Sequence, residues 1–258
     1  MLPGVLGSDA DWSAESDYNW NDGHAVISGK YAFRSWLEFQ RYVEWKRAVH
    51  ADRLKTWLEH VDEGGSRERR MAIRVLAEDP DFVRGDAWLA CAVGDVEAIR
   101  GAIAADAGWV NRAGGAMGMP PLVAVTHSKL IADEPFAASL LESARLLLDS
   151  GADVDSAWTN PKWPDTPQTA IYGAAGRTHS VAMTELLLAA DANPDDNESL
   201  YHSVESADST CTRLLLSAGA RVTGTNALGR VLDYDKLDDL RLMLRHGGDA
   251  NERSWIDH

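Results

Sequence analysis

The chain has 258 residues, of which 45% are hydrophobic and 25% are charged, and it carries a formal net charge of -15. This composition is ordinary for a folded protein. The negative charge argues against partners such as nucleic acid or an anionic membrane, because Lys and Arg must neutralise their phosphates. It suits solubility in general, or a partner protein with a basic segment.

The cysteines and the apolar runs of the sequence indicate in which cellular compartment the protein is expected. Cys91 and Cys211 both fall in predicted helices, which indicates a reducing compartment and no disulfide framework. The first seven residues, Met-Leu-Pro-Gly-Val-Leu-Gly, lack the basic start and long apolar core of a signal peptide. No apolar run approaches the ~18 residues that a membrane-spanning helix needs. We therefore expect a cytoplasmic protein.

The N-terminal part divides into two predicted segments. Residues 1–34 are rich in Asp, Gly, Ser and Asn, which predicts a mobile acidic lead-in. Because this segment also contains tryptophans, a second interpretation is that it folds back and packs on the rest of the protein. Residues 35–85 show helical periodicity, with Trp36, Phe39 and Val43 on one face. That face is either core or a partner-binding stripe, and a core is the commoner reason for such a pattern.

A leucine run followed by a turn recurs along the rest of the chain. It reads LLLDSGADVD from Leu146 and returns from Leu186, Leu214 and Leu242, at spacings of 40, 28 and 28 residues. The leucines close the buried face of a helix, and Gly151 stands where a positive φ ends it. Self-similarity of this kind predicts an array of repeated helix pairs.

These stretches resemble the second helix and outgoing turn of ankyrin repeats. Gly94-Asp95 lies between two short helices, as a Gly-Asp pair does in the family. Where the family has Thr-Pro-Leu-His-x-Ala, this chain has Pro120-Pro121-Leu122 in one unit and Thr169–Ala175 in another. The stretches Glu198–His202 and Gly224–Leu228 resemble bacterial ankyrin repeat domain-containing proteins. The resemblance covers roughly residues 66–252. It implies an all-α solenoid of helix-turn-helix repeats with finger loops.

The domain plan follows from this resemblance. Residues 35–85 would be an N-terminal helical cap with a degenerate first repeat, residues 86–252 the ankyrin repeats, and residues 253–258 a tail. The first clear unit would have helices at 87–92 and 96–105. Finger 156–169 is long and the last two units are short, so the surface of the array would be uneven.

The sequence shows no pattern of a catalytic, cofactor or metal site. The glycine-rich stretch Gly114–Gly118 lacks the Gly-Lys-Ser/Thr of a phosphate loop, so we interpret it as a finger turn. The eight histidines are dispersed, with no His-x-x-x-His pair for a metal. Cys91 has no basic neighbour that would activate a nucleophile.

The ankyrin resemblance implies a binding surface instead. Finger tips and the exposed side of each first helix would line a concave groove, where Trp and Arg are favoured anchors. The candidate partner-binding residues are Trp158, Lys162, Trp163, Arg177, His202, Glu205 and His127. The alternative for the two tryptophans is packing on the adjacent finger.

We therefore expect a protein–protein interaction module without catalysis of its own, whose partner has a basic segment. Two other hypotheses stay open. The N-terminal helical region, rich in Trp and Tyr, could carry an enzymatic or regulatory activity. The chain could also self-associate into a homo-oligomer through an open C-terminal end of the array.

Overall fold

The computed structural model describes residues 20–252, with the backbone alone for Trp20. It is mostly helical and contains one small two-stranded sheet, so the predicted all-α class is confirmed at that level. The chain divides into two compact units, residues 1–53 and residues 54–258. The predicted tail at 253–258 and the first 19 residues of the predicted lead-in lie outside the described residues.

The N-terminal unit contains α1 (Trp20–Lys30), α2 (Trp36–Arg47) and the start of α3 (His50–Asp62). Helix α1 falls inside the segment that was predicted to be a mobile lead-in. Asp22 in its first turn and Lys30 in its last turn complement the helix dipole, and the His24 ring stacks on the Trp36 ring at 4.2 Å. Local charge placement and ring packing therefore support a helix where composition indicated none.

The buried side of α2 is shifted from the predicted one. Tyr42, Trp45 and Glu38 are buried, whereas Trp36 and Phe39 are only half-buried. Glu38 tolerates burial because its carboxylate accepts a hydrogen bond from the backbone N–H of Arg34 at 2.8 Å.

The unit from Leu54 onward is built of helix pairs joined by turns and loops. The pairs are α3 with α4 (Ser66–Glu78), α5 (Ala87–Val93) with α6 (Val96–Ala105), α7 (Pro121–Thr126) with α8 (Phe136–Asp149), the π-helix η3 (Tyr172–Arg177) with α9 (Val181–Ala189), α10 (Ser199–Ser203) with α11 (Thr210–Ser217), and α12 (Ala227–Asp233) with α13 (Leu237–Arg245). Two short 3-10 helices, η1 (Ala107–Asn111) and η2 (Lys129–Ala132), lie in the connections.

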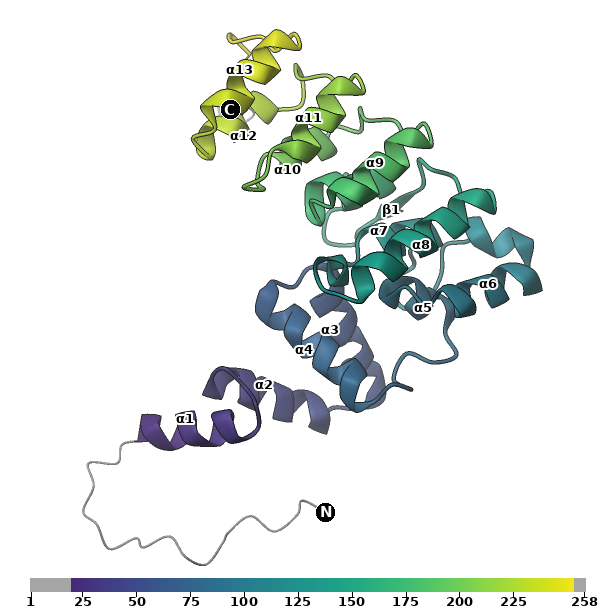
Figure 1. Cartoon of the computed structure of the whole chain (residues 1–258), viewed down its shortest axis with the longest axis vertical. Coiled ribbons are helices and arrows are strands. Elements are labelled where there is room, and N and C mark those ends of the chain that lie inside the picture. Colours follow the sequence, from purple (N-terminus) through teal and green to yellow (C-terminus); the bar gives the residue numbers. More distant parts are fainter. Residues whose placement is uncertain (1–19, 253–258) are drawn as a thin grey trace, which may run out of the picture. The chain divides into compact units, whose positions relative to one another are not determined.

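From α5 onward, the pairs stack in one row (Figure 1). The first helices touch in the order α5, α7, η3, α10 and α12, and the second helices in the order α6, α8, α9, α11 and α13. Helix α4 packs mainly on η2. Each pair therefore buries its apolar side against the pair before and after it, which is how a repeat array builds a core.

The recurrent turn predicted from the sequence links each pair to the next. Gly151 has the expected positive φ, +89°, and Asp191 takes the same place in the next turn with φ +64°. The side chain that ends one turn accepts a hydrogen bond from a backbone N–H of the following turn. The four donor–acceptor links are Asp153 to Asn111 (2.7 Å), Asn193 to Asp155 (2.8 Å), Arg221 to Asp195 (3.3 Å) and Asp249 to Thr223 (3.3 Å).

The long finger 156–169 forms a β-hairpin that the sequence did not predict. Strands β1 (Ala157–Thr159) and β2 (Pro167–Thr169) pair antiparallel, with Trp158 opposite Gln168. Both central side chains are buried, at 7% and 4% exposure. The hairpin therefore has an inner side, which holds these two residues, and an exposed tip.

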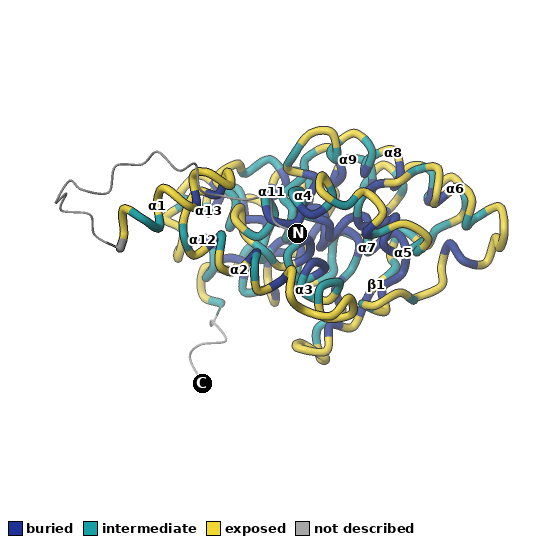
Figure 2. The backbone as a smooth tube through the Cα atoms, turned by 90° about the horizontal axis from the view of Figure 1, so that it is seen from below, coloured by how far each residue is buried: buried dark blue, intermediate teal, exposed yellow. Residues whose placement is uncertain are grey.

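Buried residues are concentrated where the middle pairs meet, around α5, α7, α8 and α9 (Figure 2). Cys91 on α5 is a small buried thiol of this core, and Cys211 on α11 is buried as well. Among residues 20–252, no helix is both long and apolar enough to cross a membrane.

Candidate binding surface

The first helix of each pair contributes to one continuous surface. We call the surface formed by α5, α7, η3, α10 and α12 the first-helix face. The sequence analysis placed the candidate partner-binding residues on this side. The structure shows that the face has two parts, which differ in what covers them.

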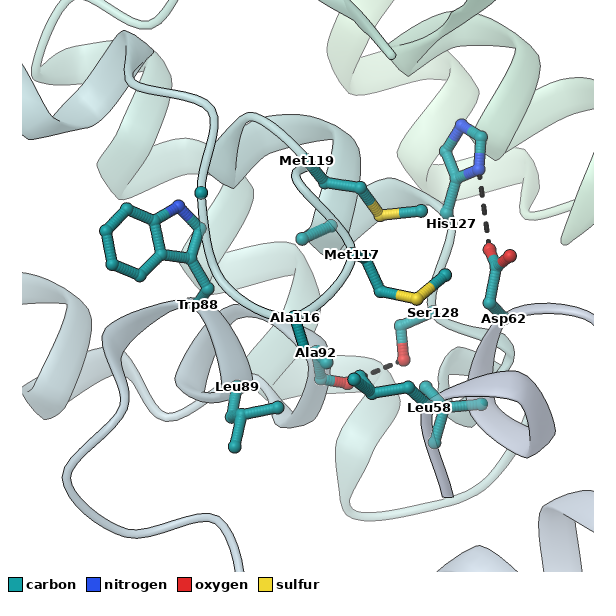
Figure 3. A pocket seen from close by; sticks show the side chains of 13 residues that line it. Leu58, Asp62, Trp88, Leu89, Ala92, Ala116, Met117, Met119, His127 and Ser128 are labelled. Atoms are coloured by element: carbon teal, nitrogen blue, oxygen red, sulfur yellow. Dashed lines mark hydrogen bonds and ion pairs between the residues drawn. The ribbon is translucent and has the colours of Figure 1, made fainter. Parts of the chain in front are cut away.

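Helix α3 of the chain itself covers the part formed by α5, α7 and η3. Leu58 and Val61 on α3 line a small cavity together with Leu89 and Ala92 on α5 (Figure 3). The cavity measures about 30 Å³ and is mostly apolar. A space of this size is far below the several hundred Å³ of a small-molecule site, so it is a packing space between α3 and the array.

Loop 112–119 closes the other side of this cavity, and its glycines have a packing reason. A Cβ on Gly114 would lie 2.3 Å from the Trp88 ring, and one on Gly115 would lie 2.6 Å from the Trp88 Cβ. The Trp88 indole N–H donates to the carbonyl oxygen of Arg112 at 3.2 Å. The glycine-rich stretch is thus a turn pressed against an indole, in line with its interpretation as a finger turn.

The carboxyl end of α3 carries a buried charge cluster. The Arg177 guanidinium donates to the backbone carbonyl of Asp62 at 2.8 Å and lies 3.2 Å from its carboxylate. The His127 Nδ1 atom lies 3.6 Å from the same carboxylate, and its Nε2 atom lies 3.0 Å from the carbonyl oxygen of Thr169. Asp62 and His127 are 5% and 1% exposed. A cation at the carboxyl end of a helix is favourable, because unpaired carbonyls and the helix dipole make that end negative.

The pKa shifts in this cluster have opposing causes. Burial raises the pKa of Asp62, but the contact with His127 and the charge of Arg177 outweigh it and hold this pKa below its usual range. Burial lowers the pKa of His127, which the contact with Asp62 only partly opposes. The arrangement therefore holds an ionised Asp62 between a guanidinium and a neutral imidazole.

Two lysines complete the contact around Glu63. Lys129 Nζ donates to the backbone carbonyl of Glu63 at 3.1 Å. Lys162 Nζ, from the hairpin tip, lies 2.5 Å from the Glu63 carboxylate. The end of α3 is thus held by three cations, Lys129 from η2, Lys162 from the hairpin and Arg177 from η3, and these basic residues are already paired within the chain.

A row of rings leads from the covered part to the open part of the face. His127 contacts Tyr172 with ring centroids 5.8 Å apart, Tyr172 contacts His202 at 5.3 Å, and His202 contacts Tyr201 at 4.8 Å. Gly173 and Gly176 make this row possible, since a Cβ on Gly173 would lie 2.2 Å from the His127 ring.

The open part of the first-helix face lies on α10 and α12. Glu205 accepts hydrogen bonds from His202 at 2.9 Å and from Arg230 at 2.6 Å. The Arg230 guanidinium lies over the rings of Tyr201 and Tyr234, 5.2 and 5.0 Å from their centroids. Beside Tyr201, a hollow of about 200 Å³ opens between the loops that precede α10 and α12.

The seven predicted residues therefore have four different surroundings. His127, Arg177 and Lys162 contact the end of α3, and Trp158 is buried in the hairpin. Trp163 is 63% exposed at the hairpin tip. His202 and Glu205 lie together on the open part.

Some residues of this face had no signal in the sequence patterns. Asp62 and Glu63, at the end of α3, were not singled out. Tyr201, Arg230 and Tyr234 were not singled out. Arg230 and Tyr234 follow Tyr201 by 29 and 33 residues, and these separations become meaningful only once the stacking of α10 on α12 is known.

Within residues 20–252, no group of three or more His, Cys, Asp or Glu side chains could hold a metal ion. Burial raises the pKa of the Cys91 and Cys211 thiols, which opposes the thiolate form that a nucleophile needs. Compared with known proteins, the sequence matches no model of a protein family and no curated protein. The geometry of the surface therefore carries the functional argument.

Proposed function

We propose that this chain is an ankyrin-type repeat protein that binds a partner protein on the open part of its first-helix face. The assignment to the ankyrin type rests on the sequence resemblance. It is supported by helix pairs stacked in one row and by the turn-to-turn hydrogen bonds at the recurrent Gly-Ala-Asp stretch. A rigid stacked scaffold suits recognition, because little order is lost when a partner binds.

The observation that carries the proposal is the half-exposed cluster of aromatic and acidic side chains on α10 and α12. Tyr201, His202 and Glu205 are neither buried nor fully exposed, and Tyr234 is 41% exposed. Rings of this kind supply large contact area at low entropic cost.

The charge of this cluster points to a basic segment on the partner. Glu198 flanks His202 at 3.4 Å, and Asp233 flanks Arg230 at 3.4 Å, so its two basic side chains are already surrounded by carboxylates. The net charge of -15 would add long-range attraction for a cationic segment and speed the encounter.

The test is affinity capture from an extract of the source cells with the full chain and two charge-reversal variants. Glu198→Lys places a positive charge on the proposed surface, and Glu142→Lys makes the same change on exposed α8, on the second-helix side. We expect one partner retained by the wild type and by Glu142→Lys, and lost or reduced at least about tenfold with Glu198→Lys. Retention by Glu198→Lys at the wild-type level would refute the proposed surface.

A further inference from the structure

The hollow beside Tyr201 lies between two neighbouring loops of the array. It is lined by Asn197, Glu198 and Tyr201 on the α10 side and by Thr225 and Asn226 on the α12 side. Its volume of about 200 Å³ is below the several hundred Å³ of a small-molecule site. The hollow therefore suits a single side chain of a bound segment.

Three polar side chains in this lining have no hydrogen-bond partner among the described residues. They are the amides of Asn197 and Asn226 and the hydroxyl of Tyr201. Asn226 and Tyr201 are half-buried, so they have lost part of their hydration. Thr225 differs, because its hydroxyl already donates to the carbonyl oxygen of Val222 at 2.6 Å. A ligand that hydrogen-bonds the open groups replaces the contacts with water that they have lost.

The lining carries an acid and no base. Among the described residues that line the hollow, Glu198 alone is charged, and its side chain is 27% exposed. The His202 Nε2 atom lies 3.4 Å from this carboxylate, which is longer than a charge-assisted hydrogen bond of about 2.8 Å. An ionised carboxylate offers about four acceptor positions, so Glu198 can accept from a ligand as well. The charge of the hollow therefore selects a cation.

The chain itself shows how this surface holds a cation. The Arg230 guanidinium lies 5.2 Å from the centroid of the Tyr201 ring and donates to Glu205 at 2.6 Å. A tyrosine ring beside a carboxylate is thus a pairing that already binds a positive group within the array. The hollow presents the same pairing, Tyr201 with Glu198, and none of its lining residues is basic.

The arrangement of the acceptors favours lysine over arginine. An ammonium group has three donors that can point to acceptors on different residues, whereas a guanidinium is planar and matches a single carboxylate best. The Glu198 carboxylate and the amide oxygens of Asn197 and Asn226 come from two separate loops. Acceptors that are spread around one hollow in this way match an ammonium.

The walls of the hollow are held by hydrogen bonds within the chain. The Asp196 carboxylate accepts from the backbone N–H of Glu198 at 3.1 Å and from that of Ser199 at 2.8 Å. Asn197 and Asn226 both have a left-handed backbone, with φ +70° and +58°, which asparagine tolerates better than most residues. Loops that are fixed before binding lose little order when a ligand arrives.

We propose that this hollow, between the loops that precede α10 and α12, is a pocket for one lysine side chain of the partner. The lysine ammonium contacts the Glu198 carboxylate and the amide oxygens of Asn197 and Asn226, and its alkyl chain lies against the Tyr201 ring. The inference rests on the proposed function, because it names the side chain by which the basic segment of the partner is recognised.

A thermodynamic cycle with a selected peptide tests this proposal. Random linear peptides displayed on phage are depleted on Glu198→Lys, which removes those that bind elsewhere, and are then selected on the full wild-type chain. In the tightest binder, each basic residue is replaced in turn by norleucine. We expect one lysine whose replacement raises the Kd at least about tenfold, since a hydrogen bond with a charged group is worth about that factor.

The same replacement should lose its effect when the pocket is changed. On Glu198→Gln, and on the double variant Asn197→Gly with Asn226→Gly, it should change the Kd by less than about threefold. Glycine accepts a left-handed backbone, so the double variant removes both amides without straining the loops. The matched control is Asp191→Gly, at an exposed residue with φ +64° in the turn after α9, and it should keep the full effect. Melting temperatures show that each variant is folded.

Three outcomes would overturn the proposal. They are a selection that leaves no lysine-dependent peptide, a lysine whose effect is equal on the wild type and on Glu198→Gln, and an arginine replacement that binds as tightly as lysine. If Glu198→Lys still loses the captured cellular partner, the proposed surface stands without the lysine pocket. If Glu198→Lys retains that partner, the proposed function itself fails.

Discussion

At the scale of single residues, the contact between Asp62 and Arg177 joins the carboxyl end of α3 to η3. Burying two charges costs free energy, which the pair recovers only through good geometry and extra hydrogen bonds. Here Arg177 donates a hydrogen bond to the Asp62 backbone carbonyl and lies 3.2 Å from the Asp62 carboxylate, whose oxygens accept no hydrogen bond from the described residues. The two side chains are 11% and 8% exposed, so solvent screens their attraction only weakly.

Arg177→Met should therefore destabilise the protein by about 2–4 kcal/mol, because it leaves the Asp62 carboxylate buried without its cation. Adding Asp62→Leu should recover much of that loss, since no charge then remains buried. The matched control is Arg84→Met, whose ion pair with Asp81 is 75% and 68% exposed and should contribute less than about 0.5 kcal/mol. Urea unfolding at neutral pH measures all three. Equal effects of Arg177→Met and Arg84→Met would contradict the role given to the cluster.

The sequence analysis singled out the basic residues of this contact but not the acidic end of α3 that they meet. His127, Lys162 and Arg177 were placed on one surface through the ankyrin resemblance. The acidic end of α3 occupies that surface. Asp62 is 65 residues from His127 and 115 residues from Arg177 in the sequence, and no local pattern encodes a contact between residues so far apart. The two finger tryptophans differ for a similar reason, because the cross-strand pair of Trp158 with Gln168 buries the first and leaves Trp163 at the tip.

At the scale of elements, local signals predicted the helices well and the hairpin poorly. The second helix of the first clear unit was predicted at 96–105, and α6 spans Val96–Ala105. Asp95 explains this accuracy, because its side chain caps the helix by accepting the backbone N–H of Ala98 at 3.0 Å. Strands β1 and β2 have only three residues each, too few for an alternating pattern to be visible in sequence.

The close approach of η3 to α7 depends on a single glycine. A Cβ at Gly173 would meet the His127 ring at 2.2 Å and the Thr126 hydroxyl at 2.7 Å, both on buried residues that have little room to move. Gly173→Ala should therefore lower stability by about 1–3 kcal/mol.

The control for that substitution is Gly101→Ala in α6, where an added Cβ meets nothing within 4 Å. Alanine has the higher helix propensity, so this change should raise stability by about 0.5–1 kcal/mol. If η3 stacks on α7 as described, thermal unfolding should show a lower melting temperature for Gly173→Ala and a higher one for Gly101→Ala. A loss of stability at Gly101 equal to that at Gly173 would contradict the close approach to His127 as the cause of the Gly173 effect.

At the scale of the whole molecule, the row of helix pairs presents surfaces that differ in their side chains and in what covers them. The part of the first-helix face on α5, α7 and η3 is filled by α3. The part on α10 and α12 is open and carries aromatic and acidic side chains. The recurrent leucine turn predicted the scaffold, whereas these surface differences depend on side chains that only the stacking brings together.

Site-specific photo-crosslinking in the source cells tests most directly whether the open first-helix face binds a partner. A photoreactive side chain is placed in turn at Tyr201 and Tyr234 on that face, and at Glu142 and Arg213 on exposed positions of the second helices. We predict one crosslinked partner from the first two positions and none from the last two. Crosslinks that form from Glu142 or Arg213 but not from Tyr201 or Tyr234 would contradict the proposed binding surface.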